Sequence, residues 1–137
     1  MVGADYYQGV LESLYALLES RSTQAYQWSE SDHWRQARSP ERTEPLEVWI
    51  DIGGISGFNR SDVVHAARLV FLSRYVPDSD SLSQARAAAA TRDVIEALAI
   101  WSRPDGPRAL PQRTAIAGRE DLVEITIEFA LYLPRGA

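Results

Sequence analysis

The segment Leu122-Val-Glu-Ile-Thr-Ile-Glu-Phe-Ala-Leu-Tyr-Leu133 decides the fold class of this chain. Apolar side chains occupy every second position from Val123 to Leu133, and Glu124, Thr126 and Glu128 stand between them. A period of two is typical of a β-strand with one buried face. The segment therefore predicts a long, half-buried strand.

A second segment, Leu46 to Ile52, alternates in the same way and also predicts a strand. Glycines at 53, 54 and 57 follow it, and we expect them to break the strand into a flexible loop that carries Phe58. This glycine cluster is not a phosphate-binding loop, because such loops end in Gly-Lys-Ser/Thr and the chain has no lysine.

Two segments are more ambiguous. Asp62 to Val76 can be drawn as a helix or as a strand, but its β-branched and aromatic residues, and Pro77 after it, favour a strand. At about 3.3 Å per residue it would be roughly 50 Å long, so one end would project beyond its own core. Arg108 to Arg119 reads as a loop or a short strand.

Two helices complete the pattern. Tyr6 to Ser20 carries apolar side chains at spacings of three and four. Leu82 to Trp101 is rich in alanine and is followed by Pro104, Gly106 and Pro107, which end it. We therefore expect an α+β fold: an antiparallel or mixed sheet of about four strands, two main helices on one face, and a long projecting hairpin or loop.

The segment from Arg21 to Pro45 is polar and is expected to be a long loop or arm. Part of it, Gln24 to Trp28, could be a short edge strand. Trp28 and Trp34 need burial, either on their own domain or against a neighbouring subunit. The sequence leaves both alternatives open.

Composition narrows the function. The 137 residues fit one domain, 1–137, and the net charge of −5 argues against non-specific nucleic-acid binding. Without cysteine there is no disulfide, thiolate zinc site or thiol nucleophile. No apolar run approaches the ~20 residues of a membrane span. The first five residues lack the features of a signal peptide, so we expect a cytoplasmic protein.

The sequence shows no catalytic pattern. His33 and His65 have no partners at metal-site spacing, and His65 reads as a partly buried structural residue. Glu124 and Glu128 share one strand face, where a solvated role is the simpler interpretation than an acid–base pair. We therefore expect no catalytic, cofactor-binding or metal-binding residues and no enzyme activity.

The order of elements resembles that of bacteriophage tail terminator proteins, which are also found in gene transfer agents. Three features carry the resemblance. They are the strand Leu46-Glu-Val-Trp-Ile-Asp-Ile52, the strand–turn–helix Arg74-Tyr-Val-Pro-Asp78 with Ser83-Gln-Ala-Arg-Ala-Ala-Ala-Ala-Thr-Arg-Asp-Val-Ile95, and the closing Ile125-Thr-Ile-Glu-Phe-Ala-Leu-Tyr-Leu133. The likeness is one of pattern and order from Tyr6 to Leu133, and the 21–45 segment is where the chain departs from it.

The resemblance implies a structural virion protein. Six copies would form a ring on the last tail-tube ring, stop tube growth and meet the head–tail connector or stopper protein. DNA would pass through the lumen without specific binding. The protein would be found in the virion neck, and in the host cytoplasm during assembly.

Exposed aromatic and arginine side chains suit such a ring interface. The residues expected to make subunit contacts are Trp28, Trp34, Arg35, Phe58, Arg68 and Arg74. Alternative interpretations are another head–tail connector or neck protein, a small α+β adaptor or binding module, and a small enzyme that uses His65 with carboxylates.

Overall fold

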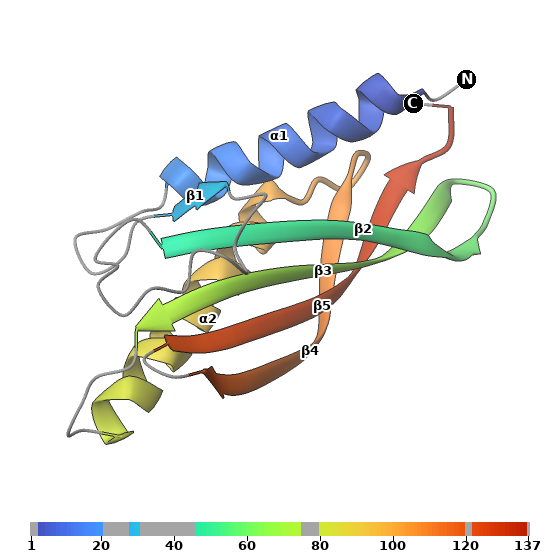
Figure 1. Ribbon diagram of the computed structural model, residues 1–137. Coiled ribbons are helices and arrows are strands. Elements are labelled where there is room, and N and C mark those ends of the chain that lie inside the picture. The colour runs from blue at the N-terminus through green and yellow to red at the C-terminus, as the bar shows by residue number, and fades with distance from the viewer. Residues whose placement is uncertain (1–2, 21–27, 31–45, 75–79, 120–121, 137) are drawn as a thin grey trace.

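The computed structural model describes residues 3–20, 28–30, 46–74, 80–119 and 122–136, and in these residues the chain is an α+β protein (Figure 1). Two helices accompany a five-stranded sheet. The elements follow one another as α1 (Ala4–Ser20), β1 (Trp28–Glu30), β2 (Leu46–Phe58), β3 (Asp62–Arg74), α2 (Asp80–Trp101), β4 (Arg108–Arg119) and β5 (Leu122–Pro134).

The strands lie in the order β1-β2-β3-β5-β4. The four long strands pair antiparallel, whereas the short β1 runs parallel to β2. The pairing of β3 with β5 is unbroken from Asp62 opposite Pro134 to Arg74 opposite Leu122. The strand predicted at 122–133 is thus confirmed, and the strand predicted at 62–76 is confirmed as far as Arg74, since residues 75 and 76 lie outside the described residues.

One face of the sheet carries the core. Because side chains alternate along a strand, the register places Ile50, Leu69 and Ile127 in one row on that face. Both helices contribute to the same apolar cluster, through Val10, Leu14 and Leu18 of α1 and through Ala87, Ala90, Val94, Ala97 and Leu98 of α2. Each fully buried Leu, Ile or Phe contributes about 1.5–3 kcal/mol from its removal from water.

The helices sit differently on the sheet. In Figure 1, α2 crosses behind the strands, and its alanines leave room for that close approach. Helix α1 runs along β2, where the backbone N–H of Ile50 donates to the Tyr15 hydroxyl at 2.9 Å. Neither of these two helices in the described residues is long and apolar enough to cross a bilayer.

Strand β2 corrects one expectation. The glycines do not break it into a loop, since the strand continues to Phe58, with register shifts between Ile52 and Ile55 and between Ile55 and Gly57. At Gly53 a β-carbon would lie only 2.7 Å from the Ala66 carbonyl oxygen. Glycine therefore permits a close approach of two backbones inside an irregular strand.

Strand β4 is longer than expected. The segment read as a loop or short strand forms 12 residues of strand paired along β5. The alternation of apolar and polar residues in β4 is weak because the strand lies at the edge of the sheet and because its register shifts between Pro111 and Arg113. Proline is tolerated at edges and bulges, where its missing N–H breaks no ladder. Pairing with β5 thus outweighs local propensity.

A matched pair of glycine substitutions tests the close approach in β2. Gly53→Ala should lower the free energy of unfolding by about 1–3 kcal/mol, because the new methyl group meets a backbone oxygen that cannot move aside. Gly54→Ala is the control, since nothing lies within 4 Å of its added β-carbon. Urea unfolding measures both, and equal stability of the two variants would contradict the geometry.

Candidate functional site

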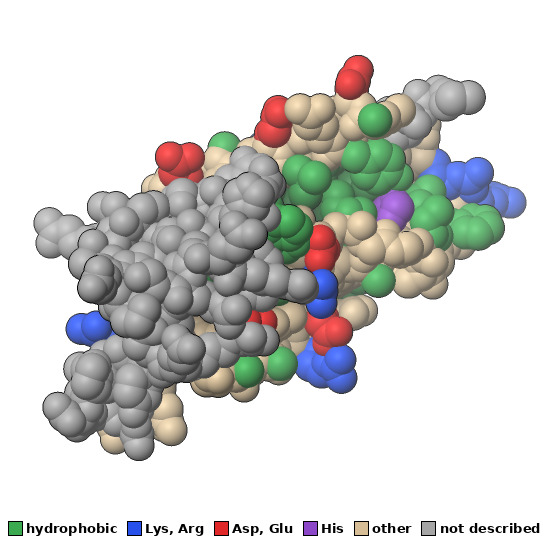
Figure 2. Space-filling model, in the orientation of Figure 1, with side chains coloured by type: hydrophobic (Ala, Val, Ile, Leu, Met, Phe, Trp, Pro, Cys, Tyr) green, Lys and Arg blue, Asp and Glu red, His purple; other side chains and the backbone are tan. Residues whose placement is uncertain are grey.

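The face of the sheet opposite the helices carries a row of four charged side chains. Asp51 lies opposite Arg68, Arg68 opposite Glu128, and Glu128 opposite Arg113, so the row crosses β2, β3, β5 and β4. We call these four residues the charge ladder. Figure 2, which views this face, shows Asp and Glu side chains (red) and Arg side chains (blue) alternating across the strands.

Direct contacts join the ladder at both ends. The Arg68 Nε atom donates to Asp51 Oδ2 at 2.9 Å, and the Arg113 Nε atom donates to Glu128 Oε2. The indole N–H of Trp49 donates to the other Asp51 oxygen at 2.9 Å. Each charge therefore has an opposite charge beside it, which leaves the ladder electrically balanced.

The ladder perturbs one carboxyl group. The hydrogen bond from Arg113 is the largest effect and lowers the pKa of Glu128. Desolvation opposes it, and the positive charges of Arg113 and Arg68 lower the pKa further. The same pairing raises the pKa of Arg113. Both groups are exposed to solvent, so their pairing contributes little to the stability of the fold.

Beside the ladder, apolar side chains on the same face of the sheet are withdrawn from solvent. Val70 and Leu72 of β3 are buried, and Trp49 packs against them. The part of this face that is exposed to solvent among the described residues therefore includes the row of paired charges.

Two residues expected at a subunit interface are described with their side chains, and the structure does not bring them together. Phe58 ends β2 and is 73% exposed, opposite Val63 on the face that carries the helices. Arg68 lies in the charge ladder on the other face. The positions of Val63 and Arg68 are five residues apart along β3, which is about 16 Å.

The other four expected interface residues remain predictions. Trp28 begins β1 and pairs with Leu46, and Arg74 ends β3 opposite Leu122. For both residues the structure describes the backbone but not the side chain. Trp34 and Arg35 lie outside the described residues. The short edge strand expected at 24–28 shares only Trp28 with β1 (Trp28–Glu30), and residues 24–27 lie outside the described residues.

His65 is buried in a hydrogen-bonded position between α1 and β2. Its Nε2 atom lies 2.9 Å from the Tyr7 hydroxyl and its Nδ1 atom lies 3.0 Å from the Gly53 carbonyl oxygen. Since a carbonyl only accepts, Nδ1 carries the proton and Nε2 accepts from Tyr7. The ring of Tyr7 meets the imidazole edge to face at 5.3 Å. Both ring nitrogens of His65 thus hold α1 and the glycine segment of β2 together.

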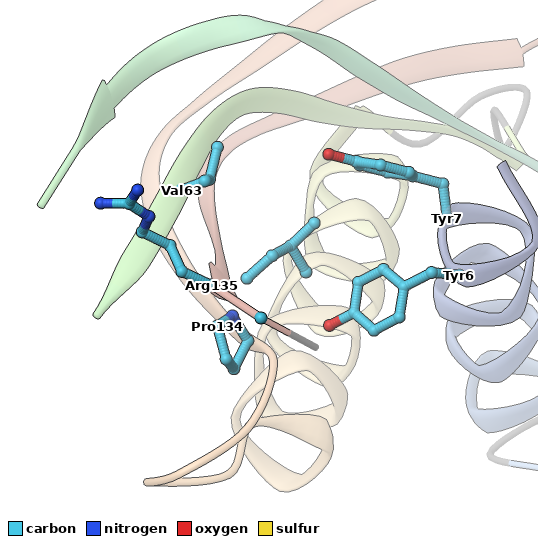
Figure 3. Close-up of a pocket in the computed structure, with 7 residues that line it drawn as sticks. Tyr6, Tyr7, Val63, Pro134 and Arg135 are labelled. Atoms are coloured by element: carbon cyan, nitrogen blue, oxygen red, sulfur yellow. The ribbon is translucent and has the colours of Figure 1, made fainter. Parts of the chain in front are cut away.

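A small hollow lies where the start of α1 meets the end of β5 (Figure 3). Tyr6 and Tyr7 project from α1 towards the strand ends, and the walls are Tyr6, Tyr7, Val63, Leu133, Pro134, Arg135 and Gly136. Its volume of about 150 Å³ is well below the ~300–1,000 Å³ of ligand pockets. Among the described residues, no cluster of three or more His, Asp or Glu side chains could hold a metal ion.

Sequence reasoning missed the charge ladder. Only Arg68 was singled out, because the partners come from three other strands and their alignment depends on register. The alternation along Leu122–Leu133 did place Glu128 on the polar face. Arg113 could not be aligned with it while β4 was read as a loop or short strand.

Removing the arginine at one end of the charge ladder should free the Glu128 carboxyl from its hydrogen bond. In Arg113→Gln the pKa of Glu128 should rise towards its ordinary value, because the hydrogen bond that lowers it is lost. NMR titration of the side-chain carboxyl carbon measures this shift. Arg92→Gln, which breaks the exposed Arg92–Glu96 pair on α2, is the control and should leave Glu128 unchanged.

The sign of the pH effect follows from that direction. The folded-state pKa of Glu128 lies below the unfolded value, so the pairing contributes above the unfolded pKa and is lost as the pH falls through the folded pKa. Acid unfolding of the wild type and Arg113→Gln should therefore converge at low pH. A Glu128 pKa that is the same in both proteins would contradict the pairing.

Removing the hydroxyl group of Tyr15 and removing that of Tyr6 should have different effects on the stability of the fold. Tyr15→Phe should cost about 1 kcal/mol, since the N–H of Ile50 loses its acceptor. The Tyr6 hydroxyl has no hydrogen-bond partner among the described residues, and its burial raises the pKa of the phenol. Tyr6→Phe should therefore leave stability unchanged or increase it. Thermal unfolding compares the two, and a larger loss in Tyr6→Phe would contradict the assignment.

No protein-family model matches the chain, and no curated protein matches it. The functional conclusion therefore rests on the geometry of the sheet and on the pattern of the sequence.

Proposed function

We propose that this chain is a structural virion protein: a tail terminator that forms a ring at the head-proximal end of a phage or gene transfer agent tail. Two observations support the proposal. The chain is an α+β protein that contains the helix, strand, long strand, helix and long strand on which the resemblance depends, together with the further strands β1 and β4. Strands β2 and β4 also expose large apolar side chains, which suit contact with other proteins.

The observation that carries the proposal is the one-sided sheet. Four strands of 13, 13, 12 and 13 residues form a broad surface whose helices contribute to a core on one face only. The other face holds the charge ladder in the described part of the chain. An extended sheet with an exposed row of paired charges on one face suits a subunit that meets neighbours and partners there.

The proposed partners follow from that role. Copies of the chain contact one another in a ring of six, the tail tube protein meets one side, and the head–tail connector or stopper protein meets the other. DNA passes through the lumen without being held. The net charge of −5 and the pairing of Arg68 and Arg113 with carboxylates both suit a surface that does not retain DNA.

Electron microscopy tests the proposal. Purified protein should show closed rings with a central hole, and class averages should give six-fold symmetry. In particles, an antibody or gold label on the chain should mark the joint between tail and head. A protein that stays monomeric at high concentration and labels no particle would overturn the proposal. A label elsewhere in the neck would assign it to another connector protein.

A further inference from the structure

The outer edge of β4 has no strand beyond it in the described part of the chain. The sheet order ends at β4, which pairs with β5 on its inner side only. Edge strands expose a row of backbone N–H and C=O groups that can pair with another chain. We call the segment Arg113–Arg119, which pairs regularly with Leu122–Glu128, the β4 edge.

The usual protections are missing from the centre of the β4 edge, between the charged residues Arg113 and Arg119. The proline and the register shift of this strand both lie before it, at Pro111. Its centre, Thr114-Ala-Ile-Ala-Gly118, is uncharged and mostly small, and Ile116 is 60% exposed. Natural proteins normally interrupt an exposed edge of this length with charge, proline or a bulge. An edge without these devices is suited to strand pairing.

The opposite edge of the sheet is covered along its first half only. Strand β1 pairs with Leu46–Val48, and the N–H of Ile50 is bonded to Tyr15. The second half, Gly54–Phe58, has neither cover among the described residues, and we call it the β2 edge. A β-carbon at Gly54 or Gly57 would meet nothing within 4 Å, so another backbone can approach closely there.

Exposed apolar side chains gather on these two strands. Of the five large apolar residues exposed in the described part of the chain, four belong to β2 and β4: Ile55, Phe58, Leu110 and Ile116. Ile116 lies opposite Ile125, and Ile55 lies opposite His65, which faces Leu131. Since Ile125 and Leu131 share one face of β5, the side chains of Ile55 and Ile116 also share one face of the sheet.

Charge argues against pairing β4 with itself. Strand β4 carries Arg108, Arg113 and Arg119 and no acidic residue. A two-fold contact would set these arginines along both sides of one new seam, where like charges repel. The β2 edge, Gly-Ile-Ser-Gly-Phe from 54 to 58, carries no charge. A β2 edge is therefore the better partner for a β4 edge.

Strand direction also permits this pairing. The three successive pairings β2–β3, β3–β5 and β5–β4 are all antiparallel, so β2 and β4 run in opposite directions within one sheet. A neighbouring copy in the same orientation would place its β2 antiparallel to β4. Such a head-to-tail contact joins two different surfaces, and it closes into a ring when the rotation between copies allows.

We propose that a second copy of this chain adds its β2 edge to the β4 edge, so that the sheets of neighbouring subunits become continuous. The closing of these contacts into a ring rests on the proposed function. In the contact itself, Ile55 and Phe58 of one copy lie against Ile116 of the next.

Site-directed cross-linking tests the contact, and the absence of cysteine makes every introduced thiol unique. Ile55→Cys and Ile116→Cys proteins, mixed and oxidised, should give a covalent dimer that neither protein gives alone. Ile100→Cys, at an exposed position on α2 (62% exposed), is the control and should not cross-link to Ile55→Cys. A chain with both substitutions should give a ladder of covalent oligomers.

Each other result has a definite meaning. Cross-linking of Ile116→Cys to itself would show a two-fold contact and overturn the inference. Equal yield with Ile100→Cys, or no cross-link, would overturn it too, and rings seen by microscopy would then leave the proposed function intact. Covalent oligomers from a protein that labels no particle would uphold the contact and refute the virion role.

A charge substitution gives an independent readout. Ile116→Lys should reduce self-association at least tenfold in sedimentation equilibrium, because it places a charge within an apolar seam. The residue is exposed, so the far-ultraviolet circular dichroism and melting temperature should stay unchanged. Ile100→Lys is the matched control. Self-association of Ile116→Lys at the wild-type level would overturn the inference.

Discussion

The pairing of β3 with β5 is the interaction on which the rest of the structure depends. Thirteen residues of each strand face one another without a shift, and the partners lie 48 to 72 residues apart in the sequence. This central pair puts Leu69 beside Ile127 on one face and Arg68 beside Glu128 on the other. A slip by one residue would exchange the two faces and expose the core. The single register therefore sets both the apolar layer and the charge ladder.

The central pair constrains each neighbouring element in a different way. Helix α2 covers the middle of the apolar face with small side chains, while α1 lies along β2 and bonds to it through Tyr15. The imidazole of His65 ties the glycine segment of β2 to Tyr7. These contacts cover the helix side and part of one edge. Among the described residues no strand pairs with the outer side of β4, and this is the edge proposed for contact with a second copy.

Much of the fold could be predicted from the sequence, because the strongest patterns belong to elements with one buried face. The alternation in Leu122–Leu133 and the apolar stripe in the first helix are direct consequences of one-sided burial. Two segments could not be predicted in this way. Glycine in β2 indicates a break unless the close contact with Ala66 is known, and β4 depends on its partner β5.

The candidate site was harder to predict from the sequence, because the four residues of the charge ladder become neighbours only through the pairing register of the strands. Arg68 was predicted to make subunit contacts, but its neighbours Asp51 and Glu128 come from different strands. The ladder also gives the sheet an electrical direction. It begins with the acid Asp51 on β2 and ends with the base Arg113 on β4. In the proposed assembly, copies in one orientation carry dipoles that all point the same way from subunit to subunit, whereas an inverted copy would point against its neighbours.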